Sequence, residues 1–396
     1  MKQNWTYKKL GEVCTIERGG SPRPINDYIT DDPNGLNWIK IGDAIDGSKY
    51  ITSTKGKIKP ECLKKTRLVH KGDFILSNSM SFGKPYILEI DGCIHDGWLV
   101  IHDNNGTFDK SFLYYLLGSP NMYREFQRLA VGGVVNNLNS EIVRNVVVPL
   151  PPLATQTRIV SELDLLQSII DKQKAQLKEY DTLAQSIFYD MFGDPVENEK
   201  EWETKRLEDL CDVSSSKRVL VEDVVESGIP FLRGTELTAL SKVVSSKDVN
   251  FTMFITPEHY ERVKAITGVP KKGDILIPSI NSEGITWVVD TDEPFYFKDG
   301  RVIWVHVNTN AFVSKYLSSV ISKVLKANYS VLTSGATFLE LKLFIIRDLI
   351  VPVPPLSLQQ SFAAKIESIE KQKAAISKSI AETEKLFEYT MDKYFG

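Results

Sequence analysis

The side chains that would catalyse reactions on nucleic acids do not form a recognisable set in this 396-residue chain. Amino methyltransferases of nucleic acids place a polar residue before two prolines and an aromatic residue after them, but leucine follows both Pro151-Pro152 and Pro354-Pro355. Asp194, Glu203 and Lys205 have the residue types and spacing of a metal-dependent nuclease, yet they lie in and just after a polar linker rather than on paired strands. His95-Asp96 could do acid–base work, and a strand-edge turn also explains this pair. We therefore predict no catalytic residues.

Metal and nucleotide sites are not indicated either. The four cysteines form no CxxC pair and the five histidines have no pair at metal-ligand spacing, so we predict no zinc site. Gly83-Lys84 is followed by proline and lacks the earlier glycine of a phosphate-binding loop. We expect neither a metal nor a cofactor in this chain.

Polar loops are better suited to recognition, because Ser, Asn, Arg and Lys hydrogen-bond phosphates and base edges. Four loops are rich in these residues: Arg18–Arg23, Ser77–Lys84, Ser215–Arg218 and Pro278–Gly284. Ordinary polar turns would account for any one loop, but their recurrence at corresponding places in two halves of the chain favours recognition. The predicted DNA contacts are Arg18, Ser21, Arg23, Lys40, Asn78, Ser79, Ser81, Lys84, Lys217, Arg218, Arg233, Ser279, Asn281 and Ser282.

Lys40 and Arg233 fill one repeated slot, each two residues after an aromatic side chain. A basic group at this position could contact a phosphate, or it could pair with the acidic residue three positions later, Asp43 or Glu236. We favour the phosphate contact.

An internal repeat places these loops in two homologous domains. WTYKKLGEVC at the start of the chain recurs as WETKRLEDLC, and Gly35–Lys40 resembles Gly228–Arg233. Lys71-Gly-Asp73 recurs as Lys272-Gly-Asp274. In each half, short β-rich runs are mixed with helix-like stretches and lack a regular βαβ alternation, which predicts an α+β fold.

A heptad seam follows each proline pair. The first seam is Ile159, Leu163, Leu166, Ile170, Gln173, Leu177, Tyr180, Ala184, Ile187 and Met191. The second, 203 residues later, is Phe362, Ile366, Ile369, Lys373, Ile376, Ile380, Thr383, Phe387, Thr390 and Tyr394. We predict two long helices, each about 60 Å long at about 1.5 Å per residue, that pair as an antiparallel coiled coil.

Gln173 and Lys373 interrupt the two seams. Such polar residues can set the register of a coiled coil, or they can be partly exposed and tolerated, and the sequence leaves both interpretations open. Thr155 and Ser357 are the predicted N-caps of the helices, because a hydroxyl can accept a hydrogen bond from a free amide there.

The predicted domain organisation is a first domain at residues 1–150, a helix at 151–193, a linker at 194–201, a second domain at 202–352 and a second helix at 353–396.

The composition is that of an ordinary globular protein, with 42% hydrophobic and 25% charged residues. No signal-peptide pattern and no 18-residue apolar run is present, so we expect a cytoplasmic protein with no membrane contact.

The duplicated pattern resembles the specificity subunit (S, HsdS) of type I restriction–modification systems over essentially the full length. Besides the repeats above, the strongest motifs are VPLPPLATQTRIV at Val148–Val160 and VPVPPLSLQQ at Val351–Gln360. The family usually has a glutamate before the glutamine of this motif, where Thr155 and Leu358 stand here. This difference leaves open any partner contact made by that carboxylate.

The resemblance implies two target-recognition domains, each reading half of a split DNA site, with the helices as a spacer. It also implies two modification subunits that supply S-adenosylmethionine and perform base flipping and methylation, and restriction subunits that use ATP and Mg²⁺. The net charge of −3 is unexpected for an independent DNA binder, because phosphate neutralisation dominates affinity. We therefore expect binding to depend on the partners.

Two other functions are compatible with the residues alone. One is an enzyme with an unrecognised nuclease or methyltransferase site. The other is a scaffold whose domains bind protein and whose helices only pair.

Overall fold

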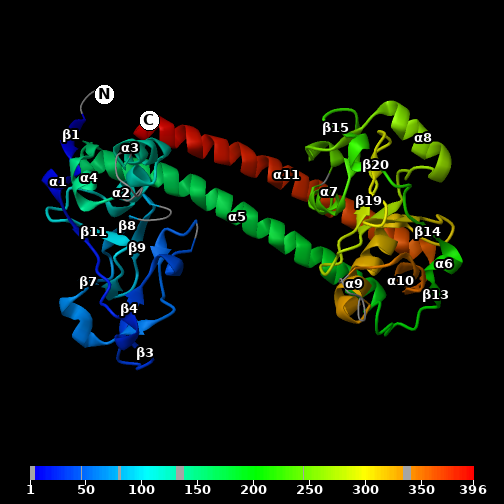
Figure 1. The fold of residues 1–396 in the computed structure, drawn as a ribbon, viewed down its shortest axis with the longest axis horizontal. Coiled ribbons are helices and arrows are strands. Elements are labelled where there is room, and N and C mark those ends of the chain that lie inside the picture. The colour runs from blue at the N-terminus through cyan, green and yellow to red at the C-terminus, as the bar shows by residue number, and fades with distance from the viewer. Residues whose placement is uncertain (1–4, 46, 79–81, 131–137, 244, 333–339) are drawn as a thin grey trace. The chain divides into compact units, whose positions relative to one another are not determined.

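The computed structural model describes residues 5–45, 47–78, 82–130, 138–243, 245–332 and 340–396. The chain forms two compact units (Figure 1). Unit 1 contains residues 1–172 and 380–396, and unit 2 contains residues 173–379. Unit 1 is made of two separate segments and unit 2 of one, and each unit includes part of both long helices. Among the residues described, no helix is both long and apolar enough to span a membrane.

The domain of unit 1 is built on two five-stranded sheets. The first has the order β2 (Cys14–Arg18), β11 (Trp98–Asp103), β8 (Phe74–Ser77), β9 (Pro85–Leu88) and β5 (Tyr50–Ile51). The second has the order β3 (Ile29–Thr30), β6 (Lys57–Ile58), β4 (Leu36–Ile39), β10 (Gly92–Ile94) and β7 (Arg67–Val69). The helices are α1 (Leu10–Val13), α2 (Lys110–Leu117), α3 (Pro120–Ala130) and α4 (Ser140–Asn145).

The domain of unit 2 has two four-stranded sheets. One has the order β14 (Asp212–Ser214), β21 (Val302–His306), β18 (Ile275–Pro278) and β19 (Trp287–Val288). The other has the order β15 (Val224–Val225), β17 (Phe254–Ile255), β16 (Ile229–Leu232) and β20 (Tyr296–Phe297). The helices are α6 (Leu207–Leu210), α7 (Gly234–Leu240), α8 (Pro257–Thr267), α9 (Ser314–Leu332) and α10 (Leu343–Arg347). The α+β class predicted from the repeat is confirmed.

Each domain closes on itself immediately before its long helix. In unit 1, β1 (Thr6–Lys9) pairs antiparallel with β12 (Val147–Leu150). In unit 2, β13 (Thr204–Arg206) pairs in the same way with β22 (Ile350–Pro352). In each domain the first strand therefore pairs with the last strand, which leads into the proline pair.

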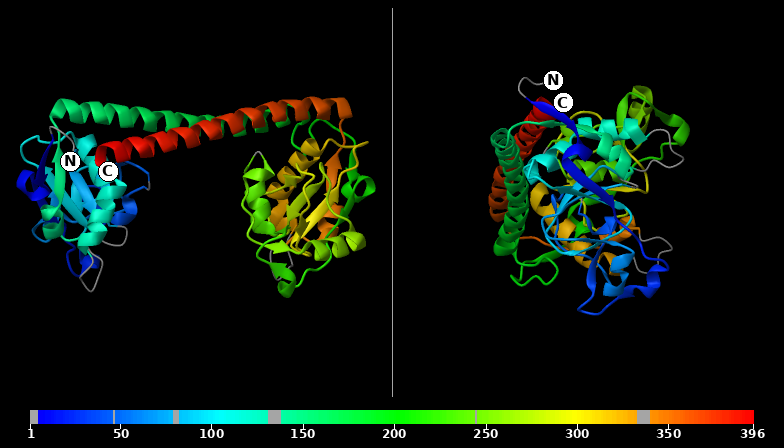
Figure 2. Two further views of the ribbon diagram at one scale, coloured as in Figure 1. Left: turned by 90° about the horizontal axis from the view of Figure 1, so that it is seen from above. Right: turned by 90° about the vertical axis from the view of Figure 1, so that its left-hand side faces the viewer.

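The two long helices predicted by the heptads are α5 (Leu153–Phe192) and α11 (Leu356–Phe395). All ten seam positions of each helix are buried or half-buried. Within unit 2, Asp181 forms an ion pair with Lys373, and the Phe188 ring lies 5.6 Å from that of Phe362. Because the partners descend in number along α11 as they ascend along α5, the helices are antiparallel. Figure 2 shows the two helices along one side of the domain in each unit.

The polar interruptions of the seam make contacts between the helices. The amide of Gln173 donates to the hydroxyl of Ser379 at 2.7 Å, and Lys373 pairs with Asp181. Both side chains are half-buried. Specific partners across the interface favour the interpretation that these residues help to set the register.

The end of each long helix is buried in the core of a domain that it does not directly follow. Phe395, at the end of α11, packs against Phe112 of unit 1 with ring centroids 5.4 Å apart. Phe192, at the end of α5, packs against Tyr316 of unit 2 at 4.6 Å. Each domain core is therefore completed by a helix end contributed from elsewhere in the chain.

The predicted N-caps are wrong. Helix α5 begins at Leu153 and α11 at Leu356, so Thr155 and Ser357 lie inside the first turn. Pro152 and Pro355 come immediately before the helices, and a proline has no backbone N–H that would need a partner there.

A buried glutamine fastens each helix start instead. The amide nitrogen of Gln156 donates to the carbonyls of Thr107 and Pro151, both at 3.0 Å, and its oxygen accepts from the amide of Asp109 at 2.8 Å. Gln359 makes the equivalent bonds to Ala311, Pro354 and Val313 in unit 2. Both glutamines are at most 1% exposed, so they satisfy backbone groups that water cannot reach.

Replacing Phe395 with alanine should lower the free energy of unfolding by about 3 kcal/mol, because the change removes a buried aromatic ring and leaves a cavity. Urea denaturation followed by circular dichroism measures this. Tyr389→Ala on the same helix is the control, since Tyr389 is 67% exposed and Phe395 5% exposed. Equal effects of the two changes would contradict the packing role of Phe395.

Candidate nucleic-acid interface

Asp96 gathers three of the predicted contact residues of unit 1. Its carboxylate accepts from the hydroxyl of Ser21 at 2.7 Å. Its backbone carbonyl accepts from Nε of Arg18 at 2.9 Å and from the side-chain amide of Asn78 at 3.0 Å. Arg18 and Ser21 lie at and just after the end of β2, and Asn78 follows β8, so one turn between β10 and β11 holds two segments that are distant in sequence.

His95, beside Asp96, is a structural part of this turn. Its Nδ1 accepts from the amide of Gly97 at 3.0 Å, and its Nε2 lies 3.0 Å from the Asp96 carboxylate. Both ring nitrogens are thus engaged within the turn. This geometry fits the strand-edge interpretation rather than acid–base chemistry.

Three basic residues that the sequence predicted to contact DNA lie close enough to His95 to lower its pKa. Burial lowers the pKa of His95; Asp96 raises it, and Arg23, Lys40 and Arg18 each lower it further. The pKa of Asp96 is also lowered: burial alone would raise it, but the Ser21 hydrogen bond and the neighbouring positive charges outweigh burial. The side chains of Arg18, Arg23 and Lys40 are exposed. The fold therefore collects scattered basic residues into one exposed cluster.

Arg233 in unit 2 is paired with an acid. Its Nε and Nη2 donate to the two carboxylate oxygens of Glu236 at 3.2 and 2.7 Å. Glu236 is 8% exposed. Burial raises the pKa of Glu236, but hydrogen bonds from Arg233 and Thr235 bring it down to about 2. The intramolecular pair is thus present here, and a phosphate contact by Arg233 stays a prediction.

Lys40, in the corresponding slot, differs from Arg233. Asp43 accepts from the backbone amide of Lys40 at 2.8 Å and from that of Lys55 at 3.1 Å. The Lys40 side chain is thus exposed, whereas the Arg233 side chain is held by Glu236.

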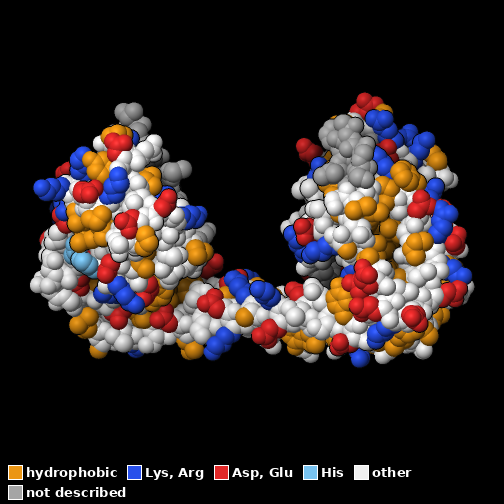
Figure 3. Space-filling model, turned by 90° about the horizontal axis from the view of Figure 1, so that it is seen from below, with side chains coloured by type: hydrophobic (Ala, Val, Ile, Leu, Met, Phe, Trp, Pro, Cys, Tyr) orange, Lys and Arg blue, Asp and Glu red, His pale blue; other side chains and the backbone are white. Residues whose placement is uncertain are grey.

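The remaining predicted residues divide by exposure. Ser279 and Asn281 are 1% and 2% exposed and Asn78 is 3% exposed, so these three side chains face inward. The exposed ones are Lys84, Lys217, Arg218 and Ser282. Ser79 and Ser81 lie outside the described residues. Figure 3 shows lysine and arginine side chains interspersed with aspartate and glutamate on the visible face of each unit.

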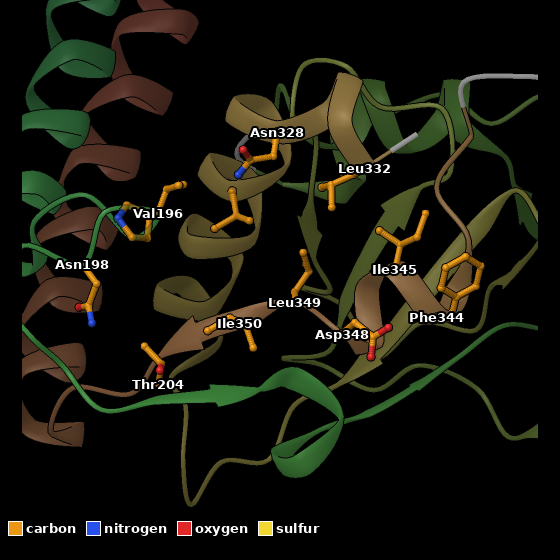
Figure 4. A pocket seen from close by; sticks show the side chains of 12 residues that line it. Val196, Asn198, Thr204, Asn328, Leu332, Phe344, Ile345, Asp348, Leu349 and Ile350 are labelled. Carbon is orange, nitrogen blue, oxygen red and sulfur yellow. The ribbon is translucent and has the colours of Figure 1, made fainter. Parts of the chain in front are cut away.

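A pocket in the described part of unit 2 brings no reactive site together among the residues that line it. This pocket of about 440 Å³ is lined mainly by apolar side chains of α9, α10 and β22, among them Leu332, Phe344 and Ile350 (Figure 4). Its carboxylate, Asp348, pairs with Arg206. Across the described ranges, no group of three or more His, Cys, Asp or Glu side chains could hold a metal ion.

Comparison with known proteins identifies the family. The profile of the type I restriction modification DNA specificity domain matches residues 2–179 and again residues 199–385. The chain belongs to this family. It is a specificity subunit, the targeting component of a type I restriction–modification system, as the sequence predicted.

The relatives are distant in sequence but match along most of their length. The type I restriction enzyme MjaVIII specificity subunit of Methanocaldococcus jannaschii is 22% identical, over 93% of this chain and 86% of the relative. The EcoBI specificity subunit of Escherichia coli is 23% identical, over 99% of this chain and 85% of the relative. A chain in a solved structure of type I R-M complex assembly and conformational transition has the same fold, with a TM-score of 0.63 and 20% identity over 100% and 98% of the two chains.

Sequence reasoning did not assign Asp96 or Glu340 to the candidate interface. Asp96-Gly97 recurs as Asp299-Gly300, and this repetition was the available signal for Asp96. Glu340, which is only 12% exposed at its side chain and pairs with Arg301, had no such signal, because Arg301 and Ser279, which it holds together, are distant from it in sequence.

Proposed function

We propose that this specificity subunit reads double-stranded DNA as a bipartite target. Each domain would contact one half-site, and the paired helices would determine the number of unread base pairs between them. The observation that carries this proposal is the duplication itself: two domains of one family, each fastened to both helices. Half-sites read from one side of DNA lie about 34 Å apart, and a helix of 40 residues is about 60 Å long.

The proposal assigns residues 1–150 and 202–352 to the two readers. Residues 151–193 and 353–396 form the spacer, and residues 194–201 form the linker. Support comes from β12 and β22, which end just before the proline pairs that begin α5 and α11.

Exposed cations would hold the DNA backbone. In unit 1 these are Arg18, Arg23 and Lys40, which cluster near His95. In unit 2 they include Lys217 and Arg218, in the segment after β14. Long basic side chains position a protein on phosphates, and neighbouring hydroxyl and amide groups can then read base edges.

The chemistry would belong to partner subunits. Two modification subunits would dock on the paired helices and supply S-adenosylmethionine, and restriction subunits would add ATP- and Mg²⁺-dependent cleavage. Leu165, Leu386 and Tyr389 are exposed apolar residues of the helices and would be available for contacts with these subunits.

Sequencing of methylated bases in cells that express this chain with its modification subunit tests the bipartite function. The expected result is methyladenine on both strands of one split motif with a constant spacer. Methylation of a continuous motif, or none above that of cells without this chain, would contradict the proposal.

Arg23→Ala should weaken DNA binding uniformly across sequences and reduce the steepness of its salt dependence by about one ion, because one phosphate contact is lost. Fluorescence anisotropy over a salt series, with the assembled modification complex, measures both effects. Lys8→Ala is the matched control, since this exposed lysine lies on β1, away from the Asp96 turn. An unchanged salt slope for Arg23→Ala would remove it from the contact set.

A further inference from the structure

The loop from Ser279 to Gly284, which follows β18, is held by hydrogen bonds that are partly or fully buried. The amide of Ser279 donates to the carbonyl of Arg301 at 3.0 Å, and its hydroxyl donates to Glu340 at 3.0 Å. The amide group of Asn281 donates to the carbonyl of Ile285 at 2.7 Å and accepts from the Ile285 amide. The backbone on both sides of Ile280 is therefore fixed.

The end of the loop is fixed by a close approach to α9. Gly284 has a φ of +68°, and a Cβ at this position would lie 2.1 Å from the carbonyl oxygen of Ser322. Only glycine allows this contact, because the backbone leaves no space for a side chain. The backbone amide of Asn281 also donates to the hydroxyl of Tyr329 on α9, at 3.2 Å.

The loop reverses the usual distribution of polar and apolar side chains. Ser279 and Asn281 are 1% and 2% exposed, whereas Ile280 between them is 62% exposed. Burying polar groups and exposing a large apolar one both carry a free-energy cost unless something compensates. A fixed loop that projects an isoleucine is therefore suited to contact another molecule.

Positive charge surrounds the base of this loop. Arg301 and Lys342 both pair with Glu340, at 3.2 and 2.9 Å. Burial raises the pKa of Glu340, but its hydrogen bonds with Lys342 and Ser279 and the charge of Arg301 bring it below its ordinary value. Two cations share the carboxylate of Glu340, and the carboxylate of Glu283 in the loop has its own cation, Lys326, at 3.7 Å, so these five groups together carry one net positive charge. A polyanion is thus favoured as the partner.

We propose that Ile280 contacts the 5-methyl group of a thymine in the half-site read by the second domain. This inference rests on the proposed function and names the chemical group that this loop recognises. The thymine methyl is the apolar group exposed in the major groove, and apolar side chains distinguish thymine by contacting it. Because the loop is already ordered, little conformational entropy is lost on binding.

Uracil substitution tests the contact without changing any hydrogen-bonding group of the base. The subunit, assembled with its modification subunits, is titrated with its mapped target and with duplexes in which each thymine in turn is replaced by deoxyuridine. At one thymine of one half-site, uracil should weaken wild-type binding about fourfold, as expected for one buried methyl group. Ile280→Ala should bind the thymine and uracil duplexes equally.

Ile266→Ala is the matched control, because Ile266 is 60% exposed in the same unit but lies on α8, outside the loop. This variant should keep the fourfold preference for thymine. Specific binding with no effect of uracil at any position, or an Ile280→Ala variant that still prefers thymine, would overturn this inference alone. Failure to bind the unmodified target specifically would overturn the proposed function and this inference together.

Discussion

The burial of the two helix ends is the interaction on which the rest of the structure depends. Phe395 completes the core around Phe112, and Phe192 completes the core around Tyr316. A 40-residue helix pair is stable only when its seam is buried, and each domain lacks part of its core until a helix end arrives. Folding of the domains and pairing of the helices are therefore coupled, and buried Gln156 and Gln359 fix where each helix starts.

The candidate recognition surfaces share a second feature, an acidic residue whose hydrogen bonds join segments that are distant in sequence. Asp96 does this in unit 1 and Glu340 in unit 2, although the two residues do not correspond in the repeat. In both places the acid orders neighbouring hydroxyl and basic groups while exposed cations leave the surroundings positive. The framework is thus duplicated, whereas the loops reach similar order by different residues, as expected if the two domains read different bases.

Much of the fold could be predicted from sequence because its signals are local and periodic. The heptads located α5 and α11, and the repeat located two α+β domains. The polar loops could be identified from their composition, but composition did not reveal which side chains face inward. Ser279 faces inward because its hydroxyl donates to Glu340, which is distant in sequence, and Asn281 because its side chain bonds the backbone of Ile285. The hydroxyls of Thr155 and Ser357 suggested N-caps for a similar reason. The residues that hold the helix starts are Gln156 and Gln359, whose side chains donate to backbone carbonyls about 50 residues away in sequence.

The central claim, that the helix pair sets the distance between two readers, is tested most directly by changing its length. One heptad is inserted between Ile159 and Met191 and a matching heptad between Phe362 and Tyr394, and the methylated bases of cells expressing the variant with its modification subunit are sequenced. The expected motif keeps both half-sites and has an altered spacer. An unchanged spacer in a folded, active variant, or new bases within the half-sites, would contradict the claim.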